Sequence, residues 1–227
     1  MRSLVLVTAG LSSPSSTRAL GDALSAATTA RVSARGEGVD VTVVELRELA
    51  GELAEAMTNW VSPTPHLHAA QTAVTKADGL IAVSPVFQGS YSGLFKMFFD
   101  TLEPHSLEGL PTLIAATGGS SRHALVLDYA LRPLLNYLHA TVVPTGIFQA
   151  TEDFGTAEGA RNNKRIERAA EELADLMVRP LDRVSGLAGT LGEAEEAPQG
   201  VQSQDVDPDP SGSVSYTHLR AHETSLH

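Results

Sequence analysis

The chain has 227 residues, of which 42% are hydrophobic and 19% charged, a balance typical of a globular protein with enough apolar material for a core. Its formal net charge of -11 argues against nucleic acid as a main partner, because phosphate binding requires clustered Lys and Arg. It has no cysteine and no apolar run approaching the roughly 20 residues of a membrane span. Disulfides, thiolate metal sites and cysteine nucleophiles are thereby excluded, and we expect a cytoplasmic protein.

The first part of the chain predicts a strand followed by an anion-binding helix start. The apolar run Leu4–Val7 is too short for the core of a signal peptide and is typical of a buried central strand. It leads into loop one, residues Gly10–Arg18, which is dense in serine and threonine and runs into a helical pattern. The first turn of a helix offers free N–H groups and the positive end of its dipole, so an anion would be held here.

The rest of the chain continues the alternation of strands and helices. Strands are predicted over Val39–Leu46, Leu80–Val83, Pro111–Ala116 and Thr141–Phe148, and helices over Arg47–Met57, His66–Ala77, Leu125–Leu138 and Gly159–Val184. Pro133 lies inside one of these helices, so we expect a kink or break near Arg132. The alternation implies a parallel sheet covered on both faces. We therefore expect residues 1–184 to form one α/β domain, a doubly wound five-stranded parallel sheet in the flavodoxin-like order 2-1-3-4-5.

The composition changes from about Gly186 onward. The segment is acidic and rich in Pro, Gly and Gln, and such a segment buries too little apolar area to offset the cost of ordering it. We expect residues 185–227 to be a disordered acidic tail. Residues 214–224 resemble a translated cloning or sequencing adapter, so they are left out of the fold prediction.

The most informative stretch runs from Ser84 to Asp100. Ser84-Pro85 is expected to end the preceding strand, because proline has no N–H for a sheet ladder and restricts the residue before it. An aromatic residue, Phe87, an amide, Gln88, and several small residues follow before a helix begins. Ligands of open α/β sheets lie beyond the carboxyl ends of the strands. A loop with these groups there fits a flat, amide-rich ring, and our hypothesis is a flavin.

Three loops at carboxyl ends of strands are expected to converge on one cleft: loop one, loop two (Ser84–Gly93) and loop three (Thr117–His123). Loop one lacks both G-x-x-x-x-G-K-[ST] and G-x-G-x-x-G, so a triphosphate P-loop and a dinucleotide fingerprint are absent. What remains is a cradle for a single phosphate, with a plain capped helix as the alternative. Tyr91 is read as a core or interface tyrosine or as a flavin contact.

The histidines do not indicate a metal site. His123 is placed in the cleft, either as a ligand contact or as a helix-start residue. His218 and His222 have helical ligand spacing, but they lie in the tail, so no metal is assigned.

Residues 83–148 resemble the NAD(P)H-dependent FMN reductase family. The motifs that carry the resemblance are residues 84–96 (SPVFQGSYSGLFK), 116–119 (ATGG) and 128–135 (DYALRPLL). The likeness is greatest to the reductase partners of two-component flavin monooxygenases, of the alkanesulfonate type and of the type paired with luciferase-like monooxygenases. In many members loop one carries an Arg soon after a Gly-Ser pair. Here Gly10-Leu11-Ser12-Ser13 has none, and Arg18 comes later.

The resemblance implies that FMN binds across the three loops. Its phosphate would lie on Ser12, Ser15, Ser16, Thr17 and Arg18, its ring against Pro85, Val86, Phe87 and Gln88, with Thr117, Gly118 and Gly119 near the other edge. The nicotinamide of NADPH or NADH would stack on the ring and pass a hydride to the flavin N5, which requires no side-chain acid or base; no catalytic residue is assigned. The resemblance also implies a homodimer or homotetramer, with the helix after Tyr91 near the subunit contact.

Three functions are compatible with these expectations. The first is an NAD(P)H:FMN oxidoreductase that supplies reduced FMN to a separate flavin-dependent monooxygenase. The second is an enzyme that keeps FMN bound and reduces quinones, azo dyes or metal oxyanions. The third is a flavodoxin-like electron carrier with FMN but no nicotinamide site.

Overall fold

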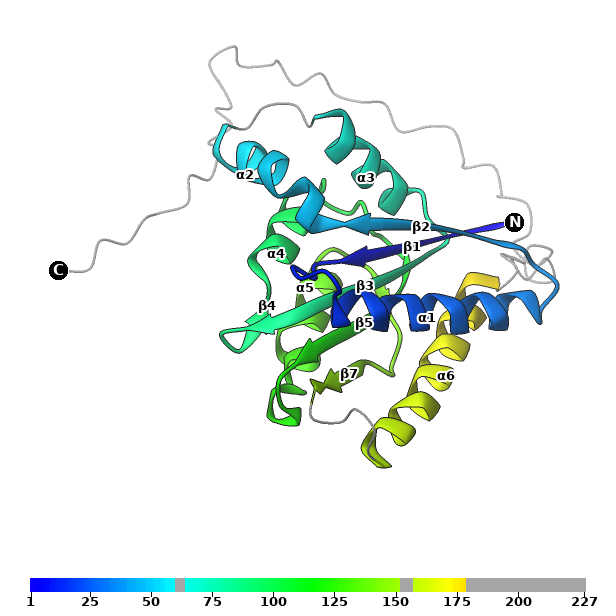
Figure 1. Cartoon of the computed structure of the whole chain (residues 1–227). Helices are drawn as coiled ribbons and strands as arrows, with labels where there is room; N and C mark the ends of the chain where they lie inside the picture. The colour runs from blue at the N-terminus through cyan, green and yellow to red at the C-terminus, as the bar shows by residue number, and fades with distance from the viewer. Residues whose placement is uncertain (60–63, 152–156, 179–227) are drawn as a thin grey trace, which may run out of the picture. The chain divides into compact units, whose positions relative to one another are not determined.

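The computed structural model describes residues 1–59, 64–151 and 157–178 (Figure 1). The chain divides into two units, residues 1–182 and 183–227, and every described residue belongs to the first. The expected acidic tail, with His218 and His222, therefore lies outside the described residues, as does the expected domain boundary at residue 184.

The strands of the first unit form one sheet whose main strands are parallel. They are β1 (Arg2–Thr8), β2 (Val39–Glu45), β3 (Gly79–Phe87), β4 (Ser90–Tyr91), β5 (Pro111–Gly118), β6 (Thr141–Val142) and β7 (Ile147–Ala150). Their order is β2-β1-β3-β5-β6, with β7 also paired to β5 and β4 paired antiparallel to β3. With β6 and β7 together in the fifth position, this is the predicted order 2-1-3-4-5, and the flavodoxin-like α/β fold is confirmed.

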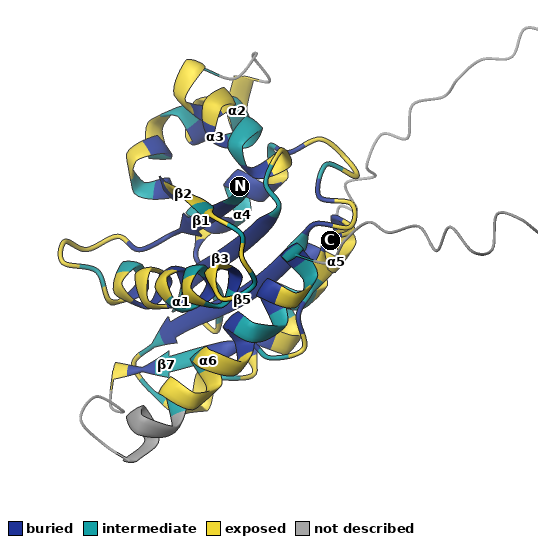
Figure 2. Cartoon of the chain, turned by 90° about the vertical axis from the view of Figure 1, so that its right-hand side faces the viewer, coloured by how far each residue is buried: buried dark blue, intermediate teal, exposed yellow. Residues whose placement is uncertain are grey.

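Helices cover both faces of the sheet. They are α1 (Ser16–Ser33), α2 (Ala50–Asn59), α3 (Pro65–Thr75), α4 (Gly93–Asp100), α5 (Arg132–Tyr137) and α6 (Ala157–Val178). Successive strand residues point to opposite faces, so β1 sends Leu4 and Leu6 toward α1 and α6, and Val5 and Val7 toward α2 to α5. Figure 2 shows the buried strands between helices whose outer surfaces are exposed.

The predicted end of β3 at Ser84-Pro85 is wrong, because the strand continues to Phe87. Backbone groups alternate between the two edges of a strand. The Val83 carbonyl accepts from the Ala9 amide (3.0 Å) just beyond the end of β1. Pro85, two residues further on, faces the same edge of β3, at a level that β1 does not reach. Its missing N–H therefore breaks no ladder bond, and loop two is a hairpin of β3 and β4 rather than an irregular loop.

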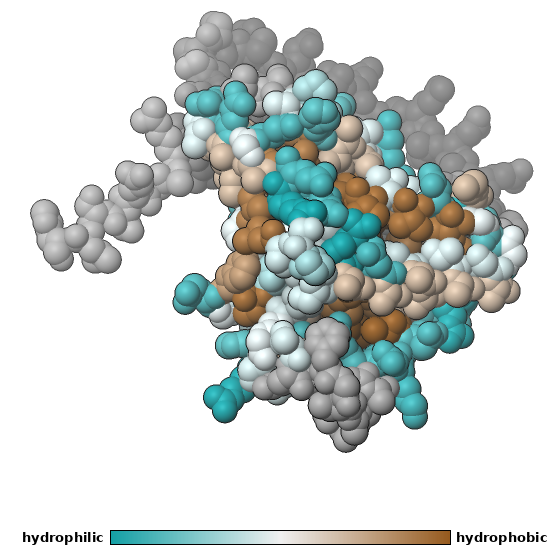
Figure 3. Space-filling view, in the orientation of Figure 1, coloured by the Kyte–Doolittle hydropathy of each residue, from teal (hydrophilic) through white to brown (hydrophobic). Residues whose placement is uncertain are grey.

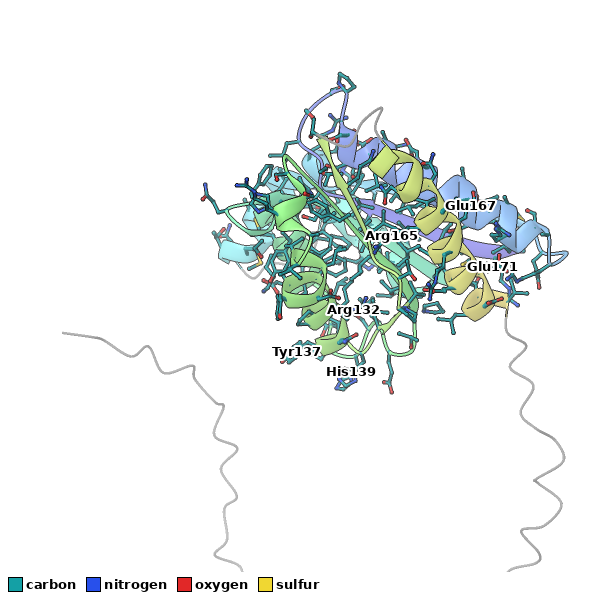
Figure 4. The ribbon with its side chains drawn as sticks, turned by 90° about the horizontal axis from the view of Figure 1, so that it is seen from below. Arg132, Tyr137, His139, Arg165, Glu167 and Glu171 are labelled. Atoms are coloured by element: carbon teal, nitrogen blue, oxygen red, sulfur yellow. The ribbon has the colours of Figure 1, made fainter. Side chains whose placement is uncertain are left out.

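The predicted fifth strand, Thr141–Phe148, is also interrupted. Between β6 and β7 the chain contains Pro144, and side chains satisfy its backbone groups in place of a neighbouring strand. Arg132 donates to two carbonyls there (3.0 and 3.1 Å), Arg165 to a third (3.0 Å), and Glu172 accepts from an amide (2.8 Å) and a hydroxyl (2.7 Å). Figure 4 shows Arg132 on the α5 side and Arg165 on α6.

At the predicted kink or break near Arg132 the helix changes type but does not end. A π-helical turn covers Leu127–Leu131 and gives way to α5 at Arg132, with Pro133 in the first turn of α5. Proline is tolerated at this position because the first N–H groups of a helix have no intrahelical acceptor.

Candidate functional site

Loop one closes tightly over the start of α1. Ser15 is the N-cap residue, and its Oγ accepts from the Arg18 amide at 3.2 Å. A Cβ at Gly10 would stand 2.1 Å from that Oγ, so only glycine lets the chain pass this close to the cap. Within the described part of the chain, the amides of Ser16 and Thr17 have no acceptor. The loop therefore presents two N–H groups at the positive end of the α1 dipole.

Loop two is held at its base by two buried serines. The Ser92 amide donates to Ser84 Oγ (2.9 Å), and Ser92 Oγ caps α4 by accepting from the Phe95 amide (3.2 Å). At the tip, Gln88 and Gly89 both have positive φ, 48° and 78°, the geometry of a two-residue type I′ turn. The hairpin thus projects beyond the sheet.

Two predicted ring contacts lie exposed on that hairpin. Phe87 is 45% exposed, so its ring is not buried in the core, and the Gln88 side chain lies on the turn. Tyr91 instead packs its ring 5.8 Å from that of Phe95 and is partly buried, which favours the core or interface reading.

Loop three is joined to loop one by a pair of buried hydroxyls. Thr17 Oγ1 and Thr117 Oγ1 lie 2.8 Å apart, and the two residues are 3% and 6% exposed. The register of β3 and β5 pairs Pro85 with Thr117, so the same residue also touches the base of loop two. The structure brings the three predicted loops together at one rim of the sheet.

Gly118 makes the contact between loops two and three close. A Cβ there would meet Phe148 Cζ at 3.0 Å and Val86 Cβ at 3.8 Å, so a side chain would push against the β7 aromatic. Gly119 is different, because nothing lies within 4 Å of its virtual Cβ. The two glycines leave open space on one side of the rim and a packed aromatic on the other.

Arg18 does not reach over loop one. Its Nε donates to Asp22 Oδ1 (2.7 Å), one turn further along α1, and its Nη1 contacts Glu45. The hydrogen bond with Asp22 and the charges of Asp22 and Glu45 raise the pKa of the Arg18 guanidinium against the opposing effect of burial. Ser12, the remaining predicted phosphate contact, is exposed in the loop.

Sequence reasoning missed a second arginine at this rim. Arg47 pairs with Glu45 (Nε to Oε2, 2.8 Å) and donates from Nη1 to the Ser12 carbonyl at 3.1 Å. The feature that points to Arg47 is the sheet register, which places Glu45 beside Thr8 at the end of β1. Figure 3 shows hydrophilic residues gathered in the middle of this face, with hydrophobic areas on either side.

A groove lies between α4 and α5, and Ser90 and Tyr91 of β4 also line it. Its volume is about 870 Å³, and its lining includes Tyr91, Tyr129 and Tyr137. Tyr129 and Tyr137 are 80% and 81% exposed. Figure 4 places Tyr137 and His139 at the end of the α5 segment, pointing outward.

Among the helices of the described residues, none combines the length and the apolar character that a membrane span requires.

The sequence and the fold both match known proteins. Residues 1–155 match the model of a family described as NADPH-dependent FMN reductase. An FMN reductase (NADPH) from Pseudomonas aeruginosa is 37% identical over 177 residues, which cover 76% of this chain and 91% of the relative. The NADH-dependent FMN reductase SfnE of Pseudomonas putida is 38% identical over 176 residues, again covering 76% of this chain and 91% of the relative. A solved oxidoreductase from Corynebacterium diphtheriae has a TM-score of 0.77 and 58% identity, covering 79% of this chain and 98% of that one.

Proposed function

Because this chain belongs to the NADPH-dependent FMN reductase family, we propose that it transfers a hydride from NAD(P)H to FMN and releases the reduced flavin to a separate flavin-dependent monooxygenase. The coarser part of this function follows from the family: the protein is an oxidoreductase that uses FMN and a reduced nicotinamide nucleotide. The residues that hold the flavin and the fate of the reduced flavin are proposals.

The residues of loop one fit a flavin phosphate. Gly10 allows the loop to fold over the helix start, where the Ser16 and Thr17 amides lack an acceptor in the described structure. We assign the phosphate to these amides and to the hydroxyls of Ser12, Ser15 and Ser16. The Thr17 hydroxyl is engaged with Thr117, so Thr17 would contribute its amide and hold loop three in place.

The flavin ring is assigned to the face between loops two and three. Pro85, Val86 and Phe87 supply apolar contact, and the Gln88 amide faces the polar edge of the ring. The open space at Gly119 and the polar backbone of loop three would receive the other edge. When bound, FMN supplies the hydride acceptor; the protein supplies alignment and exclusion of water at a rim where no acid or base is required.

The observation that carries this assignment is the Thr17–Thr117 contact at 2.8 Å. It ties the phosphate end of the site to the loop that would lie beside the ring, and it involves two residues 100 positions apart in the sequence. A chance cluster of serines at a capped helix would not require the loop after β5 to be joined to it.

Release of reduced flavin is supported by the openness of the rim. Phe87 is nearly half exposed, and no described segment folds over the hairpin tip. The relatives are named as reductases of FMN with NADPH or with NADH, and a flavin that is reduced for another enzyme has to leave the site.

We also assign the α4–α5 groove to a second copy of the chain. Its lining includes Tyr129 and Tyr137, both more than three-quarters exposed, and exposed aromatic rings around a groove are typical of an interaction surface. Light scattering after size-exclusion chromatography should give a dimer or tetramer mass. A Tyr137→Arg variant should shift it toward the monomer, whereas a wild-type monomer would refute the assignment.

The activity is tested by following oxidation of NADPH and of NADH with and without added FMN. Steady turnover that depends on added FMN supports a reductase that releases flavin. Tight FMN retention with negligible nicotinamide oxidation would instead identify an electron carrier, and turnover of a quinone by protein with retained FMN would identify the bound-flavin enzyme.

The phosphate assignment is tested separately with Ser16→Asp. The added carboxylate lies at the first helical residue and repels a phosphate dianion, so FMN binding should weaken about tenfold or more while riboflavin binding changes little. Unchanged FMN affinity in this variant would place the phosphate elsewhere.

A further inference from the structure

We infer that Arg47, a residue outside all three predicted loops, supplies the guanidinium that binds the FMN phosphate at loop one. This inference rests on the proposed function, because it adds a residue to the same site. It also replaces Arg18 as the principal cationic contact.

The fold places Arg47 beside loop one. β1 and β2 run parallel with Thr8 opposite Glu45, so both strands end at the same level. A 3-10 turn, Leu46–Leu49, follows β2, and fully buried Leu46 anchors it in the core. With Leu46 directed inward, Arg47 leaves the sheet on the solvent side, two residues beyond the strand end, as Gly10 does on the neighbouring strand.

The Arg47 side chain already reaches the loop. Its Nε binds Glu45 Oε2 at 2.8 Å, and its Nη1 donates to the Ser12 carbonyl at 3.1 Å. Its Nη2 has no hydrogen-bond partner within the described residues. A planar guanidinium can bind two oxygens of a phosphate with parallel N–H groups, and Arg47 need exchange only a neutral carbonyl to do so.

Arg18 is committed in another direction. Its Nε is held by Asp22 at 2.7 Å on the far side from the helix start, and its Nη1 contacts Glu45. To bind a phosphate with two parallel N–H groups, Arg18 would have to release one of these two carboxylates. Glu45, 18% exposed, lies between the two arginines and keeps Arg47 aimed along the loop.

The attraction for an anion at this site comes from the donors that face loop one rather than from a net charge of the cluster. Arg18 and Arg47 are balanced by Asp22 and Glu45, so the cluster is neutral before the ligand arrives. A phosphate with a charge of about -1.5 to -2 meets the free amides of Ser16 and Thr17 and the one arginine whose fork faces the loop. Such a site discriminates FMN from riboflavin, which lacks the phosphate.

The test compares binding of FMN and of riboflavin by quenching of flavin fluorescence. The variants are Arg47→Ala, Arg47→Lys and Arg18→Ala, with Arg31→Ala as the matched control. Arg31 lies on α1, as Arg18 does, but about 22 Å from the start of the helix at 1.5 Å per residue. It pairs at the surface with Glu167 and Glu171, which Figure 4 places on α6. It removes the same charge without touching the site.

Arg47→Ala should raise the Kd for FMN about tenfold or more, the effect of losing a charge-assisted hydrogen bond, and leave riboflavin within about twofold of wild type. Arg47→Lys should recover part of the loss. Arg18→Ala should weaken FMN binding by less than about threefold, and Arg31→Ala should change neither ligand.

Three results would overturn the inference. They are an Arg47→Ala variant with wild-type FMN affinity, equal losses for FMN and riboflavin, and a loss confined to Arg18→Ala. In each case the wild-type protein still binds FMN and oxidises NAD(P)H, so the proposed function survives. A wild-type protein that binds no flavin would refute both.

Discussion

Replacing Thr17 with valine removes one member of the hydroxyl pair that joins loop one to loop three while nearly preserving the side-chain shape. The two oxygens lie 2.8 Å apart and both residues are almost fully buried. The remaining Thr117 hydroxyl would be left without its partner in a place that water does not reach. Such an orphaned polar group costs about 1–3 kcal/mol. Thr117→Val should cost a similar amount for the same reason.

The double variant separates this contact from general damage. With both hydroxyls replaced by methyl groups no polar atom is orphaned, so its free energy of unfolding should lie within about 1 kcal/mol of wild type. The assay is urea unfolding followed by circular dichroism at constant m-value. Thr75→Val, at an exposed position in α3, is the matched control and should change stability by less than about 0.5 kcal/mol. Strictly additive single effects would refute the reasoning, because they would mean that the two hydroxyls do not interact.

Two further perturbations test loop one and the β6–β7 segment. Gly10→Ala should drive Ser15 Oγ from its capping position, because the new Cβ would be 2.1 Å away. The free energy of unfolding should fall by about 1 kcal/mol, and FMN binding should weaken more than riboflavin binding. The control Gly51→Ala, where nothing lies within 4 Å of the added Cβ, should do neither, and equal effects of the two variants would contradict the assignment. Partial burial opposes ionisation of Glu172, but hydrogen bonds from Thr145 and from Arg168 lower the pKa of its carboxyl below the ordinary 4.5. The stability that ionised Glu172 contributes should be complete above pH 4.5 and lost as the pH falls through the folded pKa. The Glu172→Gln variant should show no such loss. Parallel curves of unfolding free energy against pH for the wild type and the variant would refute this prediction.

The elements that depend on local pattern were predictable. Apolar runs such as Leu4–Val7 mark strands buried on both faces, and the serines before α1 mark a capped helix start. Pro133 marked the change of helix type at Arg132, because proline fits best in the first turn of an α-helix. These features follow from a few neighbouring residues, which is the information a single sequence carries.

The departures depend on residues far apart in the chain. Whether Pro85 ends β3 depends on how far β1 extends beside β3. β1 ends before it reaches the level of Pro85, so the proline costs no ladder hydrogen bond. The interruption between β6 and β7 depends on Arg132, which donates hydrogen bonds to its carbonyls, and on Glu172, which accepts from its amide, in place of a neighbouring strand. Arg47 reaches loop one only because the sheet register brings the ends of β1 and β2 together.

A crystal of this protein soaked in FMN would test the binding site most directly. We expect the phosphate on the amides of Ser16 and Thr17 within reach of Arg47, and the isoalloxazine ring against residues 85–88 with loop three at its other edge. Flavin density in the α4–α5 groove, or a rim that stays empty while FMN-dependent oxidation of NAD(P)H proceeds, would contradict the account.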